Sequence, residues 1–169
     1  PLFTEAVIGF ADGEGMLISG SDPSYRREMI IDKFPSPWAS AQFMKSLYRS
    51  ADLPTLAHTI YIFEDKLTLG FDIEIINESK EDIYIRELYP LRLTDEGSLF
   101  IFSDPKSCRV LQGHYWMTAE ENYRLRSLED GKPVRNWWTI AIASPSSKEG
   151  LVAGILSSAN TETAIITRY

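Results

Sequence analysis

The chain has 169 residues, of which 44% are apolar and 24% are charged. A chain of this length buries on the order of two-thirds of its unfolded surface, so we expect one globular domain over residues 1–169. The net charge of −7 argues against nucleic acid and against an anionic membrane surface as partners. No uninterrupted apolar stretch is long enough to span a membrane. Cys108 is the one cysteine, which excludes an intrachain disulfide and is compatible with a cytoplasmic location.

Many short alternating segments, separated by Gly, Pro, Asn, Asp and Ser, predict an all-β fold. An antiparallel β-sandwich fits them better than a parallel α/β sheet. The expected strands, in chain order, are residues 6–10, 16–19, 27–32, 58–63, 67–76, 83–93, 99–102, 109–111, 137–143, 151–156 and 164–167. Residues 9–15 are rich in glycine, but Asp12 and Glu14 would repel a phosphate, so a turn between two strands is expected there.

Two segments have helical spacing. Ser36 and Pro37 form a plausible N-cap and first turn, and a helical apolar spacing follows at Phe43, Met44, Leu47 and Tyr48. In residues 118–128, Thr118 and Glu121 have the spacing of a capping box. We therefore expect one or two short helices in the loops of the β domain.

The clearest alternation lies in residues 67–76. Asp72 and Glu74 share one face of this segment, and the other face is apolar, which is typical of a half-buried strand. Residues 77–80 supply turn residues, and residues 83–93 continue as a second strand. These two strands predict a long antiparallel hairpin, and the Asn77-Glu78-Ser79 triplet, although it matches a glycosylation sequon, is interpreted as its turn.

The residue pattern does not favour a metal site or an esterase-type catalytic site. His58 and His114 are the only histidines and lie on unrelated segments, so neither a metal site nor a cofactor is expected. Cys108 is interpreted as a small buried apolar group. No serine has the spacing of an esterase elbow.

Carboxylate pairs are the usual catalytic groups of glycosidases. Asp72 and Glu74 fit the solvated face of a strand, and Glu120 and Glu121 fit the first turn of a helix. No residue of this chain is assigned a catalytic role.

The aromatic residues are the most informative class, at 12% with four tryptophans. An indole ring can stack on the apolar face of a sugar, but it can equally pack in a core or an interface. Trp38, in a Ser-Pro-Trp turn, and Trp116 are candidate sugar-binding residues. Neighbours on a strand face opposite ways, so one of Trp137 and Trp138 should enter the core.

From residue 66 onward, the order of features resembles the N-terminal β-sandwich domain of the glycoside hydrolase family of α-galactosidases (melibiases) and raffinose synthases. The similar segments are the strand–Asn-x-Ser–strand element of residues 67–93, Val110-Leu111-Gln112-Gly113-His114-Tyr115-Trp116, Asn136-Trp137-Trp138, and Gly150-Leu151-Val152-Ala153-Gly154. Together these segments span about 90 residues. Residues 2–54 match no pattern of the family.

The resemblance implies a supersandwich-like domain that packs on a retaining catalytic barrel of the same chain. It implies that the glycine-to-tryptophan loop helps to wall a galactoside site, with Trp116 as its main residue and His114 and Tyr115 as polar neighbours. The family's loop usually reads Gly, aromatic, Gln, Ser, Trp. Here the loop is one residue shorter and has His-Tyr where Gln-Ser is usual.

The leading hypothesis is thus an accessory, non-catalytic domain of an α-galactosidase-like enzyme. Because Pro1 has no methionine before it and residues 164–167 form a terminal strand, we expect the chain to be part of a longer protein. Two alternatives stay open. One is a free-standing carbohydrate-binding sandwich, and the other is a structural or homo-oligomer-forming sandwich with Trp137 or Trp138 between chains.

Overall fold

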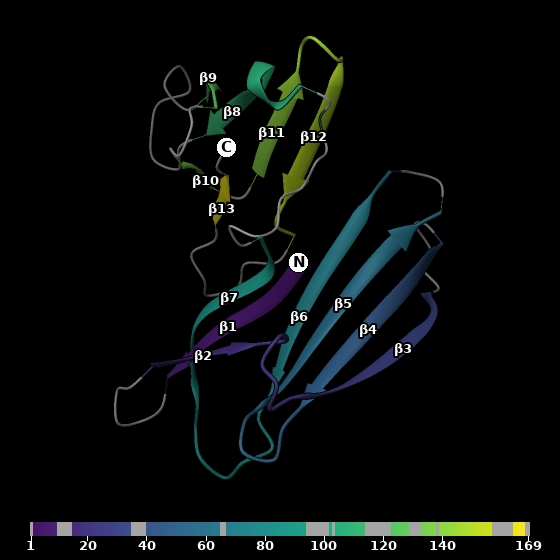
Figure 1. Ribbon diagram of the computed structural model, residues 1–169, viewed down its shortest axis with the longest axis vertical. Helices are drawn as coiled ribbons and strands as arrows, with labels where there is room; N and C mark the ends of the chain where they lie inside the picture. Colours follow the sequence, from purple (N-terminus) through teal and green to yellow (C-terminus); the bar gives the residue numbers. More distant parts are fainter. Residues whose placement is uncertain are drawn as a thin grey trace. The chain divides into compact units, whose positions relative to one another are not determined.

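The computed structural model describes residues 2–9, 15–34, 40–64, 67–93, 102, 104–113, 123–128, 133–137, 139–156 and 164–167. In these ranges the chain forms thirteen strands, β1 to β13, and one short 3-10 turn, η1 (Pro105–Ser107) (Figure 1). The predicted all-β antiparallel fold is therefore confirmed. Backbone contacts divide the chain into two compact units, residues 1–99 and residues 100–169, and the expected single domain stays a prediction. No described segment is a helix long and apolar enough to cross a membrane.

The first unit contains a four-stranded antiparallel sheet, named here the β3–β6 sheet. Its strands lie in chain order and are β3 (Arg26–Phe34), β4 (Ala41–Arg49), β5 (Thr55–Phe63) and β6 (Leu69–Ile76). The register runs through the whole sheet without a shift, with Ile31 opposite Met44 and Met44 opposite Ile60. β-branched and aromatic side chains favour this extended conformation.

A second, three-stranded sheet of the first unit has the order β2-β1-β7. Its strands are β1 (Leu2–Gly9), β2 (Gly15–Ser19) and β7 (Tyr84–Leu93). β1 and β2 pair antiparallel with Gly9 opposite Gly15. Residues 10–14, where the turn is predicted, lie outside the described residues.

A small buried cluster connects the two sheets of the first unit. Ile18 of β2 and Tyr25 are buried and pack against Tyr48 of β4 and Ile75 of β6, among others. The Tyr25 hydroxyl donates a hydrogen bond to the Pro54 carbonyl at 2.9 Å, and burial raises the pKa of Tyr25 to about 12. The two sheets thus share an apolar core, which makes this unit β-sandwich-like.

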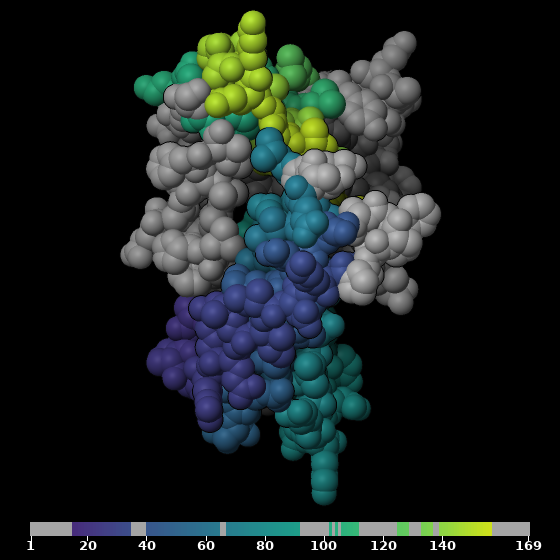
Figure 2. Space-filling view, turned by 90° about the vertical axis from the view of Figure 1, so that its right-hand side faces the viewer, coloured from purple at the N-terminus to yellow at the C-terminus, as the bar shows by residue number. Residues whose placement is uncertain are grey.

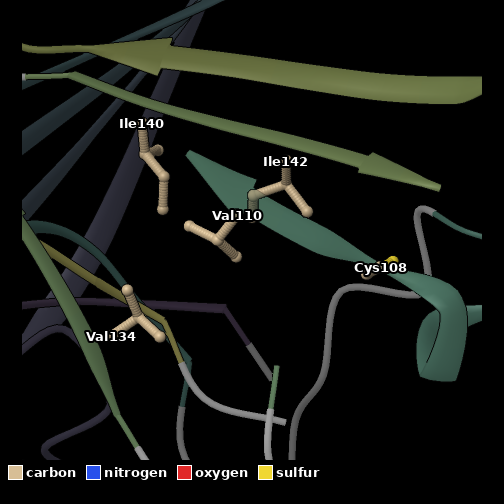
Figure 3. Close-up of a cluster of buried hydrophobic side chains, with 5 residues drawn as sticks. All are labelled: Cys108, Val110, Val134, Ile140 and Ile142. Atoms are coloured by element: carbon tan, nitrogen blue, oxygen red, sulfur yellow. The ribbon is translucent and has the colours of Figure 1, made fainter. Parts of the chain in front are cut away.

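The second unit also contains a four-stranded antiparallel sheet, of order β12-β11-β8-β9. Its strands are β8 (Arg109–Gly113), β9 (Tyr123–Ser127), β11 (Thr139–Ser144) and β12 (Glu149–Gly154), and a separate pair joins β10 (Val134–Trp137) to β13 (Ala164–Thr167). Five buried side chains form the core between these elements: Cys108, Val110, Val134, Ile140 and Ile142 (Figure 3). Cys108 is 1% exposed, which confirms its interpretation as a small buried group.

The predicted helix in residues 36–49 is wrong where the structure describes the segment, because residues 41–49 are strand β4. β4 lies between β3 and β5, and side chains on both of its faces are partly or fully buried. Phe43 and Leu47 lie on one face, and Met44 and Tyr48 lie on the other. A strand that packs on both faces has apolar residues on both of them, so apolar and polar residues no longer alternate along it. Here the apolar residues fall at the spacing of a helix.

The second predicted helix is also wrong over its described part, since Tyr123–Ser127 is strand β9. The capping-box residues Thr118 and Glu121 lie outside the described residues. β9 pairs with β8, with Leu111 opposite Leu125. The backbone pairing between two strands overrides the weak local preference for a helix.

The predicted hairpin of residues 67–93 is wrong in its pairing, although both strands exist. β6 pairs with β5, and β7 pairs with β1, so the two strands belong to different sheets. Asn77 organises the connection, because its Oδ1 accepts hydrogen bonds from the backbone and hydroxyl of Ser79 and its amide donates to the Glu81 carbonyl at 2.8 Å. The predicted turn at residues 77–79 is confirmed, but it leads from one sheet to the other.

We expect Ile140→Ala to lower the free energy of unfolding by about 2–5 kcal/mol, because Ile140 is 2% exposed and its truncation leaves a cavity in the core of the second unit. The matched control is Val152→Ala, on the neighbouring strand β12, where the side chain is 73% exposed and the change should cost less than about 0.5 kcal/mol. Urea denaturation followed by circular dichroism measures both. Equal losses for the two variants would contradict the placement of this core.

Candidate functional site

The four residues predicted to bind sugar, Trp38, His114, Tyr115 and Trp116, lie outside the described residues. Trp138 also lies outside them, and Trp137 is described only as the last residue of β10. Their roles therefore stay predictions. The structure does describe the strand ends next to residues 114–116 and Trp138, and those ends can be placed.

Residues 114–116 and Trp137-Trp138 belong to segments that adjoin one end of the second unit's sheet, whereas Trp38 belongs to the segment between β3 and β4 of the first unit. β8 and β11 are antiparallel with Leu111 opposite Ala141, so the last residue of β8, Gly113, and the first residue of β11, Thr139, belong to the same end of the sheet. Gly113 also pairs with Tyr123 of β9, and Thr139 pairs with Gly154 of β12. These strand ends form what we call the Gly113 end of the sheet, and His114-Tyr115-Trp116 follows it directly in the chain.

At the opposite end of β8, hydroxyl groups gather around one carboxylate. This group, named the Asp104 cluster, consists of Asp104, Ser107, Ser144 and Ser146. The Ser146 hydroxyl donates to Asp104 Oδ2 at 2.9 Å, and the Ser107 hydroxyl donates to the Asp104 carbonyl at 3.0 Å. The Ser107 Oγ lies 2.8 Å from the Ser144 Oγ and 2.7 Å from the Ser146 Oγ. The cluster thereby ties η1 to the end of β11 and to the turn that follows it.

Sequence reasoning missed the Asp104 cluster. Asp104-Pro105-Lys106-Ser107 and Ser144-Pro145-Ser146-Ser147 each read as an ordinary turn sequence. The two halves are 42 residues apart between Asp104 and Ser146, and only the pairing of β8 with β11 brings them together. No local signal in either half relates it to the other.

The electrostatics of the Asp104 cluster suit anchoring rather than proton transfer. Hydrogen bonds, first from the Ser146 side chain, hold the pKa of Asp104 below its usual value, so the carboxylate is an acceptor at neutral pH. Burial raises the pKa of the neighbouring Cys108 thiol, and the negative charge of Asp104 adds to this effect. A neutral thiol is a poor nucleophile, and an ionised carboxylate cannot act as a general acid.

The first unit contains a buried histidine. His58 on β5 is 5% exposed, stacks on Phe71 with ring centroids 6.3 Å apart, and has no partner for its Nε2. Burial lowers its pKa, and the positive charge of Arg27 acts in the same direction, whereas a hydrogen bond to the Pro90 backbone and the charge of Asp72 oppose it. This imidazole is therefore a neutral core residue at pH 7 without the solvent access that a general base needs.

The carboxylate pair of β6 has the role that the sequence predicts. Asp72 and Glu74 are both exposed, and Glu74 forms an ion pair with Lys45 at 2.7 Å across the sheet. The interpretation as a solvated face is confirmed, while Glu120 and Glu121 lie outside the described residues. Among the residues that the structure places, no group of three His, Cys, Asp or Glu side chains could hold a metal ion.

Comparison with protein-family models, curated proteins and solved structures finds no match for this chain.

We expect Ser146→Ala to raise the pKa of Asp104 toward 3.8, because the Ser146 hydrogen bond is the main cause of its lowered pKa. NMR titration of the carboxylate measures the shift. The control is Ser147→Ala, since the Ser147 hydroxyl donates to Glu149 at 2.6 Å and not to Asp104. An unchanged Asp104 pKa in Ser146→Ala would contradict the geometry of the cluster.

We expect the free energy of unfolding to decrease as the pH falls below 6.5, because His58 takes up a proton at pH 6.5 in the unfolded chain but only at lower pH in the folded one. Denaturation curves measured between pH 7.5 and pH 5 give the free energy of unfolding as a function of pH. Its slope against pH should be shallower in His58→Gln than in the wild type. A slope that survives in His58→Gln would show that other groups cause it.

Proposed function

We propose that this chain is the N-terminal accessory β-sandwich domain of a retaining, α-galactosidase-like glycoside hydrolase. In this proposal the domain packs on a catalytic barrel of the same protein and contributes Trp116, with His114 and Tyr115, to a galactoside site. The barrel supplies the nucleophile and the general acid. The chain itself supplies sugar contacts and no catalytic group.

One observation carries the proposal. The three later segments that resemble the α-galactosidase family, residues 110–116, 136–138 and 150–154, are separated in the sequence. The described parts of two of them, residues 110–113 on β8 and 150–154 on β12, nevertheless lie in one sheet on either side of β11, with Ala141 opposite both Leu111 and Val152. Asn136 and Trp137 of the third lie on β10, which pairs with β13 and precedes β11 directly in the chain. Two chance matches far apart in a chain have no reason to lie in one sheet, so this arrangement supports reading residues 110–113 and 150–154 as parts of one element.

The Gly113 end of the sheet gives the proposal a physical basis. His114-Tyr115-Trp116 follows Gly113, and Trp137-Trp138 precedes Thr139, so three of the four tryptophans belong to segments adjoining this end. Indole rings stack on the apolar faces of sugar rings, and such contacts require little conformational entropy because the side chain is rigid. An end of a rigid sheet is a suitable support for a binding loop.

The electrostatic arrangement supports a binding role for the chain rather than catalysis. A retaining glycosidase needs a carboxylic acid of raised pKa beside a carboxylate nucleophile, about 5 Å apart. In the described segments the one aspartate next to β8, Asp104, has a lowered pKa, and Glu74 of the β6 pair forms an ion pair with Lys45. A neutral sugar partner also suits a chain of net charge −7 better than a nucleic acid or an anionic membrane does. A cytoplasmic location is part of the proposal, on the basis of the single, buried cysteine.

The test uses the product of the complete reading frame and a chromogenic α-galactoside. We expect hydrolysis, and we expect Trp116→Ala to raise KM about threefold to tenfold with a smaller effect on kcat, because one stacking contact with the sugar is lost. Trp116→Phe keeps a ring and should recover most of the affinity. Leu67→Ala, at a fully exposed position on the first unit, is the control and should leave KM unchanged.

The outcomes separate the proposal from its alternatives. A reading frame without a catalytic domain, or a folded Trp116→Ala protein with unchanged KM, would refute it. Calorimetric titration of the 169-residue chain with a galactose-containing oligosaccharide tests the alternative that the chain binds sugar as a free-standing module. Tight binding that is lost in Trp116→Ala or Trp38→Ala, without any catalytic domain in the frame, would favour that module instead.

A further inference from the structure

Strand β3 is a long and exposed edge of the β3–β6 sheet. It pairs with β4 along all nine residues, Arg26 to Phe34, and every one of these residues is exposed. In the sheet order, the other side of β3 has no neighbouring strand among the described elements. Figure 2 views the molecule from the side on which β3 lies in Figure 1, and the dark purple-blue surface of this part of the chain faces the viewer.

This edge carries charged side chains, but it lacks the other features with which proteins usually prevent edge-to-edge association. Protected edges are short or carry a proline or a β-bulge, whereas β3 contains no proline and its register with β4 has no shift. It also exposes large apolar side chains on both faces: Met29 (55% exposed), Ile30 (47%), Ile31 (68%) and Phe34 (44%). An edge of this kind presents a row of backbone donors and acceptors to an additional strand.

We propose that β3 pairs antiparallel with β3 of a second copy of this chain, in a register centred on Met29. Two antiparallel strands place residues of the same face opposite each other, so each possible centre defines a distinct set of pairs. With Met29 at the centre, Arg26 lies opposite Asp32 of the second copy, and the two-fold symmetry repeats this pair. Glu28 then lies opposite Ile30, and Arg27 lies opposite Ile31.

The charges of β3 select this register over its neighbours. Centring on Ile30 places Arg27 opposite Lys33 and Glu28 opposite Asp32, and symmetry repeats both like-charge pairs. Centring on Ile31 places Ile30 opposite Asp32 and forms no ion pair. Opposite charges across a strand pair stabilise the pair and like charges destabilise it, so the Met29-centred register is the favoured one.

The same argument explains why β3 rather than β6, the other edge of this sheet, takes the second copy. The charged residues of β6 are Asp72 and Glu74, both negative and both exposed. Pairing two β6 strands across a two-fold axis at Ile73 would place Asp72 opposite Glu74 twice. β3 carries both signs of charge and can therefore complement itself.

The test measures the molar mass of the complete 169-residue chain by light scattering and sedimentation over a concentration series. We expect a monomer–dimer equilibrium. Ile31→Lys should raise the dissociation constant at least about tenfold, since the new lysine lies opposite Arg27 of the second copy at two symmetric positions. Ile62→Lys is the matched control, because Ile62 is 52% exposed on the same face of the sheet but lies on the interior strand β5, and it should leave the equilibrium unchanged.

A charge exchange tests the register itself. Arg26→Asp and Asp32→Arg should each weaken the dimer about tenfold, and the double variant should restore it, because the pair is then reversed but complementary. Both positions are exposed, and thermal melts confirm that each variant is folded. A wild-type chain that stays monomeric at the highest concentration would overturn the proposal, as would a dimer unaffected by Ile31→Lys. Failure of the double variant to restore the dimer would overturn the register.

Discussion

Antiparallel backbone pairing is the interaction on which the rest of this structure depends. In the described part of the chain there is one short 3-10 turn and no longer helix, so peptide groups find their partners almost entirely across strands. The unbroken ladder from β3 to β6 and the ladder from β12 to β9 follow from this requirement. Every sheet that does not close on itself also ends at an edge strand. β3 is such an edge, and its outer backbone groups have no neighbouring strand among the described elements.

The connections between strands are stabilised by side-chain oxygens in place of helix caps. Asn77 closes the passage between the two sheets of the first unit, and Asp104 with its serines holds η1 to the end of β11. In both places a polar side chain accepts hydrogen bonds from groups that strand pairing leaves without a partner. The carboxylate and amide of these residues are thereby committed to the fold, which leaves the aromatic residues as the better candidates for binding a ligand.

The sequence predicted strands well where one face of the strand is covered and the other meets solvent, as in β6, where Asp72 and Glu74 alternate with apolar residues. It predicted a helix at β4, because a strand between two neighbours buries side chains on both faces and loses its alternation. The candidate sugar-binding residues could be selected from residue type and from a family pattern, since an indole has the same chemistry in any fold. The Asp104 cluster could not be found in this way, because its halves are adjacent only through the pairing of β8 with β11.

The amino-acid sequence by itself determined the all-β class, the positions of most strands, the turn at Asn77 and the burial of Cys108, because each of these follows from local alternation, turn chemistry or side-chain polarity. Only the tertiary structure decided which strands pair. β6 and β7 adjoin in the chain yet join different sheets, and β8 pairs with β11, so that Leu111 lies opposite Ala141, 30 residues later in the chain. Any strand could pair with several others, because backbone edges are chemically alike. Which strands pair depends on burial and register over the whole unit, and no single segment contains that information.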